Sequence, residues 1–272
     1  MKICVITGSR AEYGLLKNII HQIKKDRDLH LKLVVTGSHL SKKFGNTYKE
    51  ITQDGFKIDK KINIKLKSST VKSIVNSINL CMSKLVDVYK KIQPNIIIVL
   101  GDRYESFAAT VAACISRIPI AHIHGGEATE GLIDESLRHS MTKMSHIHFV
   151  AAEEYKKKVI QLGEKPKNVF LVGGLGVDSI KNLKLLNKKD LENQLSFKFN
   201  EKNLLINFHP ETLNKNYSIK FFNSFLNELK KLKNTNLIFT MSNSDVDGDY
   251  IISSIKKFSK KHKNVFLFKS IG

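Results

Sequence analysis

The sequence has no tryptophan, only four prolines and only three cysteines among its 272 residues. So little proline excludes a collagen-like or proline-rich chain. The cysteines (Cys4, Cys81 and Cys114) are scattered and odd in number, and none lies near a second ligand at zinc spacing. We therefore expect no disulfide framework and no metal site, and predict three reduced thiols that mostly fill the core.

Long hydrophobic runs are also missing. The longest clean apolar run is Ile96–Leu100, far short of the ~20 residues that span a bilayer. The first apolar stretch is interrupted at once by Gly8, Ser9 and Arg10, which excludes a secretory signal peptide. We therefore expect a cytoplasmic protein without a membrane partner. The 42% hydrophobic content supplies enough apolar side chains for a globular core and excludes disorder.

Acidic residues are scarce as well, with 25 Asp and Glu against 45 Lys and Arg, a formal net charge of +20. A nucleic-acid binder has such a balance, and so does a protein from an AT-rich genome. The lysines occur in pairs at helix ends, and no stripe alternates basic with aromatic residues. We therefore favour a solvated surface with no nucleic-acid partner, whose positive field could help an anionic small substrate. Nucleic-acid binding stays open as a non-enzymatic alternative.

What is present is a regular alternation of strands and helices. Short apolar runs separated by helical periodicity predict right-handed crossovers and a parallel, doubly wound sheet. These features predict an N-terminal Rossmann-like domain over residues 1–172. The strands expected in it are Lys2–Thr7, Leu29–Thr36, Asn95–Leu100, Ile118–Ile123, Ile147–Val150 and Asn168–Val172.

A second alternation follows over residues 203–272, after a hinge and linker region at 173–202. It predicts only three strands, whereas a doubly wound domain usually has five or six. We therefore expect an incomplete C-terminal nucleotide-binding domain in a chain truncated at its C-terminus; a minimal three-strand domain is the alternative. The glycine run Gly173–Gly176 is predicted to be a flexible hinge or a close backbone approach.

Polar and charged residues follow the predicted strands directly, at the sheet edge where ligands bind in such folds. No GxGxxG or GxxxxGK[ST] fingerprint is present after the first strand or elsewhere. Grouped Asp, Glu, His and Arg without a metal pattern suit acid–base chemistry, and arginines at helix starts suit phosphate. The pattern alone thus predicts a two-domain α/β enzyme for a phosphorylated or nucleotide ligand. The runs after the strands include Gly8–Tyr13, Gly101–Glu105, His124–Glu127, His209–Glu211 and Ser242–Asp245.

The helix predicted over Leu132–Ser145 adds two pairs spaced four residues apart. Asp134 shares a face with Arg138, and Glu135 shares a face with His139. A surface ladder of ion pairs would explain them. Because the helix begins shortly after the His124–Glu127 loop, its first turn can also face the same sheet edge.

Several of these runs together resemble the bacterial hydrolysing UDP-N-acetylglucosamine 2-epimerases of the sialic-acid and legionaminic-acid pathways, over the whole chain. The runs that carry the resemblance are Ile6–Tyr13, Gly101–Glu105, His122–Glu127, Asp134 with Arg138–Ser140, Glu153–Lys157 with Gln161–Glu164, and Phe208–Thr212. The resemblance implies a GT-B-like fold, with two Rossmann-like domains and a UDP-sugar in the cleft between them. It implies conversion of UDP-GlcNAc and water to ManNAc and UDP, by anti elimination of UDP and hydration of the glycal. No metal or redox cofactor is implied.

The resemblance also implies roles for individual residues. Asp102 and Asp134 match the family's catalytic carboxylates. Arg10 and His209 match contacts to UDP and phosphate, and Asn243 is expected near the nucleotide. Arg138 is expected to hold the carboxylates or the diphosphate, and the residue pattern itself makes Arg103 a further candidate for phosphate.

Two departures from the family pattern remain. Many relatives have Glu where this chain has His124, so the second acid or base is either His124 or Glu127. Full-length relatives continue for roughly a hundred further residues. Other readings stay open: a UDP-2,4-diacetamido-trideoxyhexose 2-epimerase of the legionaminic-acid pathway, or a GT-B glycosyltransferase. A homo-oligomer, dimer or tetramer, is expected.

Overall fold

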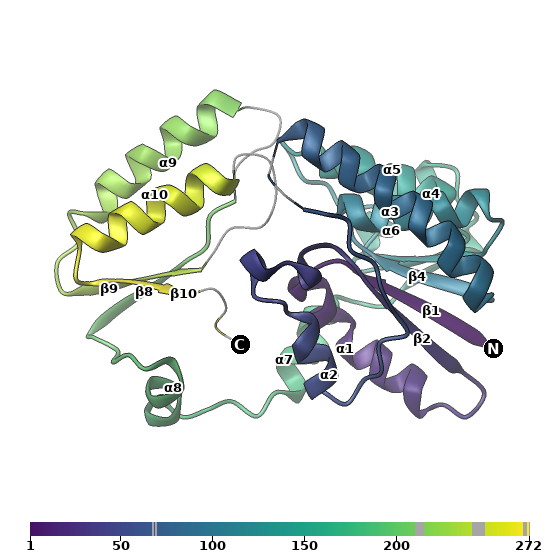
Figure 1. Cartoon of the computed structure of the whole chain (residues 1–272), viewed down its shortest axis with the longest axis horizontal. Coiled ribbons are helices and arrows are strands. Elements are labelled where there is room, and N and C mark those ends of the chain that lie inside the picture. The colour runs from purple at the N-terminus through teal and green to yellow at the C-terminus, as the bar shows by residue number, and fades with distance from the viewer. Residues whose placement is uncertain (67, 69, 210–214, 241–247, 269–270, 272) are drawn as a thin grey trace. The chain divides into compact units, whose positions relative to one another are not determined.

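A computed structural model describes residues 1–66, 68, 70–209, 215–240, 248–268 and 271. The chain divides into two compact units (Figure 1), one formed by Met1–Lys67 and Lys72–Leu183, the other by Ser68–Val71 and Lys184–Gly272. No described helix has the length and apolar character needed to cross a membrane.

The first unit is built on a seven-stranded parallel sheet. Its order is β3-β2-β1-β4-β5-β6-β7, so the chain starts in the middle and builds outward in both directions. The order reverses between β1 and β4, which is the point where open parallel sheets bind ligands. The strands are β1 (Lys2–Thr7), β2 (His30–Val35), β3 (Lys60–Lys61), β4 (Ile96–Leu100), β5 (Ile120–Ile123), β6 (Ile147–Val150) and β7 (Val169–Leu171).

Helices cover both faces of this sheet (Figure 1), with α1, α2 and α7 on one side and the other four on the opposite side. The first of them, α1, starts with a capping box in which the Ser9 hydroxyl accepts from the Glu12 backbone N–H and the Glu12 carboxylate accepts from the Ser9 N–H. The helices are α1 (Arg10–Lys25), α2 (Tyr48–Gln53), α3 (Val71–Ile92), α4 (Tyr104–Ile115), α5 (Asp134–Met144), α6 (Glu153–Gln161) and α7 (Leu175–Asn182).

One core layer of the first unit lies between the sheet and α1. Leu16 and Ile20 of α1 are fully buried against Val5 of β1 and Leu33 of β2. Leu16 and Ile20 lie four residues apart and so share one face of the helix. Every second residue of a strand points to the same face of the sheet, and these two sets of side chains pack against each other in one layer. The edge of the sheet is thereby held in a fixed geometry.

The second unit contains a three-stranded parallel sheet in the order β10-β9-β8. Figure 1 shows α9 and α10 side by side over one face of it, with Phe222 and Ile251 fully buried between them and the sheet. The elements are α8 (Lys188–Leu195), β8 (Lys202–Ile206), α9 (Lys215–Leu229), β9 (Thr235–Thr240), α10 (Gly248–Lys261) and β10 (Val265–Phe268). All three strands expected from the sequence are present.

The structure differs from the sequence expectation at three elements. The two-residue strand β3 was not predicted, because its lysines carry no apolar signal. The expected hinge and linker at 173–202 contains the helices α7 and α8. Gly173 does take a left-handed φ of 83°, but α7 then packs on α1, where a Cβ on Gly176 would lie 3.7 Å from the Leu15 side chain.

Candidate active site at the carboxyl edge of the first sheet

The candidate site lies where β1, β4 and β5 end, at the reversal of strand order. Gly8, Gly101 and His124 each directly follow one of these strands. Because the strands are parallel and neighbouring in the sheet, the residues after them converge on one edge. Three of the five loops predicted from the sequence, those that begin at Gly8, Gly101 and His124, therefore lie at one edge of the first unit.

Asp102 and Arg138 form the centre of this edge. The Asp102 carboxylate, after β4, makes an ion pair with the Arg138 guanidinium from the middle of α5. Arg138 is 5% exposed, and its other terminal nitrogen donates to the Glu127 carbonyl at 2.7 Å and to the Thr129 hydroxyl at 3.1 Å. One buried guanidinium thus fixes the loop after β4 to the loop after β5.

His124 and Glu127 form the second pair. The His124 Nδ1 lies 2.8 Å from Glu127 Oε1, and the other ring nitrogen, Nε2, is buried and has no partner among the described residues. His124 also has a left-handed φ of 64°, which is uncommon for a residue with a side chain and is concentrated at functional sites. We call Asp102, Arg138, Glu127 and His124 the edge cluster.

The loop that carries His124 and Glu127 is closely packed. A Cβ on Gly126, whose φ is 81°, would lie 2.4 Å from the Tyr155 carbonyl oxygen. A Cβ on Gly125 would lie 3.0 Å from the Thr142 hydroxyl and 3.2 Å from His122 Nδ1. Sterics therefore require glycine at 126, where backbone and a positive φ both exclude a side chain, and leave little room for one at 125.

His122 supports the edge cluster from below. Its Nε2 donates to the Gly101 carbonyl at 2.7 Å, so Nδ1 is the acceptor and lies 3.2 Å from the Thr142 hydroxyl. Complete burial lowers its pKa to about 4, which keeps the ring neutral at physiological pH. His122 thereby holds Gly101 and the start of the Asp102 loop in place.

A buried carboxylate lies beside the cluster. Glu105, in the first turn of α4, is fully buried and accepts from Arg103 Nε at 3.2 Å. Burial raises its pKa to about 7, against the opposing effect of Arg103, and its second oxygen has no partner in the described part of the chain. The carboxylate fills space next to Gly8 and Gly37, where added Cβ atoms would lie 2.9 and 2.7 Å from Glu105 atoms.

The second face of α5 ties down the same loop. Glu135 accepts from the Thr129 backbone N–H at 3.3 Å and lies 3.4 Å from both His139 Nε2 and Lys158 Nζ. The hydrogen bond from Thr129 is the main reason why the pKa of Glu135 is lowered. The predicted Glu135–His139 proximity is present. The predicted partner of Asp134 on this helix, Arg138, forms its ion pair with Asp102.

The remaining predicted residues lie outside the edge cluster. Arg10 begins α1 and forms a two-oxygen contact with Glu50, at 2.8 and 3.1 Å. Asp134 is the first residue of α5 and is half-buried. His209 is exposed, three residues after β8, in the second unit. Asn243 lies outside the described residues.

Sequence reasoning missed Glu105 and His122 as parts of the site. Both lie inside motifs that the sequence analysis singled out. The spacing does not show, however, that Glu105 is buried with one oxygen lacking a partner among the described residues, or that His122 is a neutral ring that holds Gly101. Glu12 is similar: its carboxylate accepts from Gly8, Ser9 and Ser106 and orders the turn after β1. The Ser9–Glu12 spacing is a capping-box signal that could have identified it.

The edge cluster can exchange protons. Two carboxylates and a histidine whose Nε2 has no partner among the described residues are held in fixed positions, and the Arg138 and Arg103 guanidinium groups pair with Asp102 and Glu105. Among the described residues no group of three or more His, Cys, Asp or Glu could hold a metal ion. The arrangement therefore suits acid–base chemistry on an anionic ligand.

Comparison with known sequences gives matches along nearly the whole chain. A family model described as UDP-N-acetylglucosamine 2-epimerase matches residues 21–272. A Campylobacter jejuni protein named GDP/UDP-N,N'-diacetylbacillosamine 2-epimerase (hydrolyzing) is 43% identical over 272 residues, covering 100% of this chain and 71% of that protein. The Escherichia coli polysialic acid biosynthesis protein P7 is 39% identical over 267 residues, covering 98% of this chain and 68% of P7.

Solved structures agree on the fold. The crystal structure of a Neisseria meningitidis UDP-GlcNAc 2-epimerase bound to UDP-GlcNAc matches with a TM-score of 0.79 at 22% sequence identity. The match covers 99% of this chain and 72% of that one. The expected GT-B-like α/β fold is thereby confirmed.

Proposed function

The chain belongs to the UDP-N-acetylglucosamine 2-epimerase family, and on that premise we propose that it is a hydrolysing 2-epimerase of a UDP-linked 2-acetamido sugar. The observation that carries the proposal is the edge cluster, where Arg138 joins Asp102 to the loop of His124 and Glu127. The cluster lies at the ligand-binding end of the sheet, and its groups match the proton transfers that the reaction requires.

The proposed reaction has two balanced steps. A base takes the proton from C2, the C2–H electrons form a C1=C2 double bond, and the C1–O bond breaks so that UDP leaves with its electron pair. Water then adds its oxygen to C1, and a proton returns to C2 on the opposite face. The products are UDP and a free sugar inverted at C2.

Asp102 is the proposed partner for proton transfer at C2. Its ion pair with Arg138 fixes the carboxylate in one orientation, and orientation is a large part of the efficiency of such a group. Asp134 is proposed as the second family carboxylate, supporting the positive charge that develops at the anomeric carbon.

His124 and Glu127 are proposed to act as one unit. Glu127 accepts from Nδ1, which leaves Nε2 as the nitrogen that can exchange a proton with the sugar. Of the two candidates for the second acid or base, we propose that His124 exchanges the proton and that Glu127 sets the tautomer of the ring, as in other carboxylate–histidine pairs.

The leaving diphosphate needs positive charge. Arg103 stands at the N-terminus of α4, where the helix dipole also favours an anion. Arg10, at the start of α1, is a second candidate. His209 and Asn243, from the second half of the chain, are proposed as contacts to UDP. No metal or redox cofactor is part of the proposal.

Two sugars are candidates for the substrate. UDP-N,N'-diacetylbacillosamine is favoured by the 43% identity to the Campylobacter jejuni protein, whose name gives the GDP- or UDP-linked form of this sugar. UDP-GlcNAc, with ManNAc as product for sialic-acid and surface-polysaccharide synthesis, is favoured by the family description and by the similarity to protein P7. We further propose that the protein is a cytoplasmic homo-oligomer, a dimer or a tetramer.

A GT-B glycosyltransferase is the alternative activity, and such an enzyme would need an acceptor for the sugar.

The test is a product assay on the complete gene product, with each UDP-sugar supplied separately and no acceptor. Proton NMR should show free UDP and a reducing sugar inverted at C2 from one of the two substrates. Turnover of UDP-GlcNAc alone selects the ManNAc route, and turnover of the diacetamido sugar alone selects the other. No UDP release from either sugar would contradict the proposed function.

A further inference from the structure

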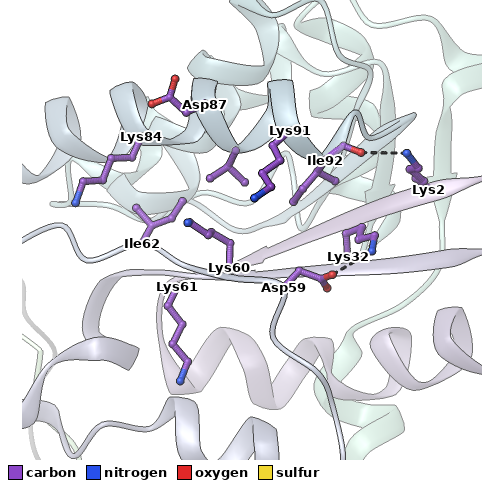
Figure 2. Close-up of a pocket in the computed structure, with 11 residues that line it drawn as sticks. Lys2, Lys32, Asp59, Lys60, Lys61, Ile62, Lys84, Asp87, Lys91 and Ile92 are labelled. Carbon is purple, nitrogen blue, oxygen red and sulfur yellow. Dashed lines mark hydrogen bonds and ion pairs between the residues drawn. The ribbon is translucent and has the colours of Figure 1, made fainter.

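A concave site lies between α3 and the β3 edge of the first sheet. It is a cavity of about 750 Å³, a size typical of small-molecule sites. None of its lining residues belongs to the candidate active site. Lys2 begins β1, whereas the active-site loop Gly8–Tyr13 follows the end of that strand, and Ile92 is the last residue of α3. Figure 2 shows its walls, in which lysines predominate. We call it the lysine groove, after Lys2, Lys32, Lys60, Lys84 and Lys91.

One of these lysines is neutralised within the fold. Lys32 Nζ lies 3.1 Å from Asp59 Oδ1, and the other Asp59 oxygen accepts from the Leu33 backbone N–H at 2.9 Å. Both oxygens of Asp59 are therefore occupied. The Lys32–Asp59 pair contributes little net charge to the groove.

Two lysines are oriented without a counter-charge. Lys2 Nζ donates to the Ile92 carbonyl at 3.3 Å, and Lys84 Nζ donates to the Asn63 carbonyl at 2.8 Å. A carbonyl uses one of the three ammonium protons and none of the charge. Each side chain is thus held at the rim and keeps donors for another acceptor.

Lys60 and Lys91 have no hydrogen-bond or ion-pair partner within the described ranges. Figure 2 shows their ammonium groups directed from β3 and from α3 into the space between them. Lys61, the neighbour of Lys60, points away and lies 3.6 Å from the centre of the Tyr48 ring. Asp87, the one acid of the groove besides Asp59, has its carboxylate turned away from the sheet.

Four ammonium groups therefore share one hollow, and no carboxylate faces them. Like charges that line one hollow repel, and an anion between Lys60 and Lys91 removes repulsion and gains charge-assisted hydrogen bonds. The floor is apolar, with Ile62 2% exposed and Val88 6% exposed, so it supplies no competing acceptor. A compact ligand with several negative charges fits this combination of charge and size.

We propose that the lysine groove is a binding site for a small phosphorylated anion, separate from the active site. Lys60 and Lys91 are the side chains that bind it from opposite walls, and Lys2 and Lys84 add positive charge further along the groove. The groove is closed on one side by Ile62 and Val88, which suits a compact polyphosphate group better than an extended polymer backbone.

The test is isothermal titration of the complete gene product with inorganic tripolyphosphate at constant ionic strength. The pocket variant is K60Q/K91Q. The matched control is K72Q/K90Q, which removes the same charge from two exposed positions on α3 outside the groove. We expect the pocket variant to bind at least about tenfold more weakly, since two charge-assisted contacts are lost, and the control to bind within twofold of the parent.

Three results would overturn the proposal. The first is the absence of measurable binding by the parent protein. The second is an equal loss in both double variants, because binding would then follow net charge alone. The third is unchanged binding in K60Q/K91Q, which places the anion elsewhere. A melting curve of each variant checks that the fold is intact before titration.

Discussion

The edge cluster and the lysine groove of the first unit handle charge in opposite ways. In the edge cluster each carboxylate has a partner: Asp102 pairs with the Arg138 guanidinium, and Glu127 Oε1 lies 2.8 Å from His124 Nδ1. In the lysine groove, Lys60 and Lys91 face each other without an acid between them. The first arrangement fixes geometry in the free protein, as proton transfer demands. The second arrangement leaves the ammonium groups of Lys60 and Lys91 available to bind an anionic ligand.

Asp102→Asn should lower turnover far more than a substitution in the lysine groove does. The amide keeps the shape but cannot accept a proton, so turnover should fall by about 10²–10⁴-fold, the usual contribution of an acid–base group. The measurement is UDP release by the complete gene product. Asp87→Asn, at an exposed acid of the lysine groove, is the control and should leave turnover unchanged. Undiminished turnover in Asp102→Asn would remove this residue from the mechanism.

Arg138→Ala should have the largest effect on stability. It leaves Asp102 without its counter-charge and the Glu127 carbonyl without its donor, in a site where Arg138 is 5% exposed. Removing one partner of a buried pair costs about 3 kcal/mol. Urea unfolding measures this loss, and a change below about 1 kcal/mol would mean that the pair does not hold the two loops together.

Gly126→Ala tests the rigidity of the loop that carries Glu127. The new Cβ would meet the Tyr155 carbonyl at a φ of 81°, so we expect a loss of at least about 2 kcal/mol of unfolding free energy. Gly14→Ala is the matched control, because that position in α1 has nothing within 4 Å of the new Cβ. It should gain about 0.5–1 kcal/mol. Equal effects of the two substitutions would show that the loop adapts.

Glu105 predicts a pH dependence of stability. Its pKa is raised from 4.5 to about 7 by burial, so the folded state binds the proton more tightly than the unfolded state. Its contribution is full below about pH 4.5 and is lost as the pH rises through about 7. Glu105→Gln should therefore match the parent at pH 5 and exceed it at pH 8, in urea midpoints. A variant less stable than the parent at pH 8 would contradict the raised pKa.

The double variant K60Q/K91Q should change stability least. Neither ammonium has a partner among the described residues, so its removal costs no contact and relieves some repulsion. We expect the free energy of unfolding at low salt to rise by no more than about 0.5 kcal/mol. A clear loss in urea unfolding would show that these lysines serve the fold, and the contrast with Arg138→Ala would disappear.

Much of the fold follows from local patterns in the sequence. The strands Lys2–Thr7 and Ile147–Val150 have the bounds that their apolar runs predict. Periodicity is informative where a whole face is buried, as in β1. It fails for β3, which has two residues, and for α8, where no residue is buried and thus no apolar stripe marks the helix.

The site was predictable only in part. The sequence shows that Asp102, His124 and Glu127 follow strands, which is enough to place them at one edge. It does not show which carboxylate forms the ion pair with Arg138. The spacing on the helix favours Asp134, four residues away, whereas the structure has the ion pair with Asp102, 36 residues away. The burial of Glu105 depends likewise on Gly8 and Gly37 approaching from other loops.

The most direct test of the central claim is the fate of the C2 hydrogen. The complete gene product is supplied with the UDP-sugar it turns over, in D2O, and the released sugar is examined by proton NMR and mass spectrometry. If the edge cluster removes and returns a proton at C2, each product molecule carries one deuterium there, with inverted configuration, beside free UDP. A sugar that keeps its original C2 hydrogen would show simple hydrolysis at C1 and contradict the assignment of the edge cluster.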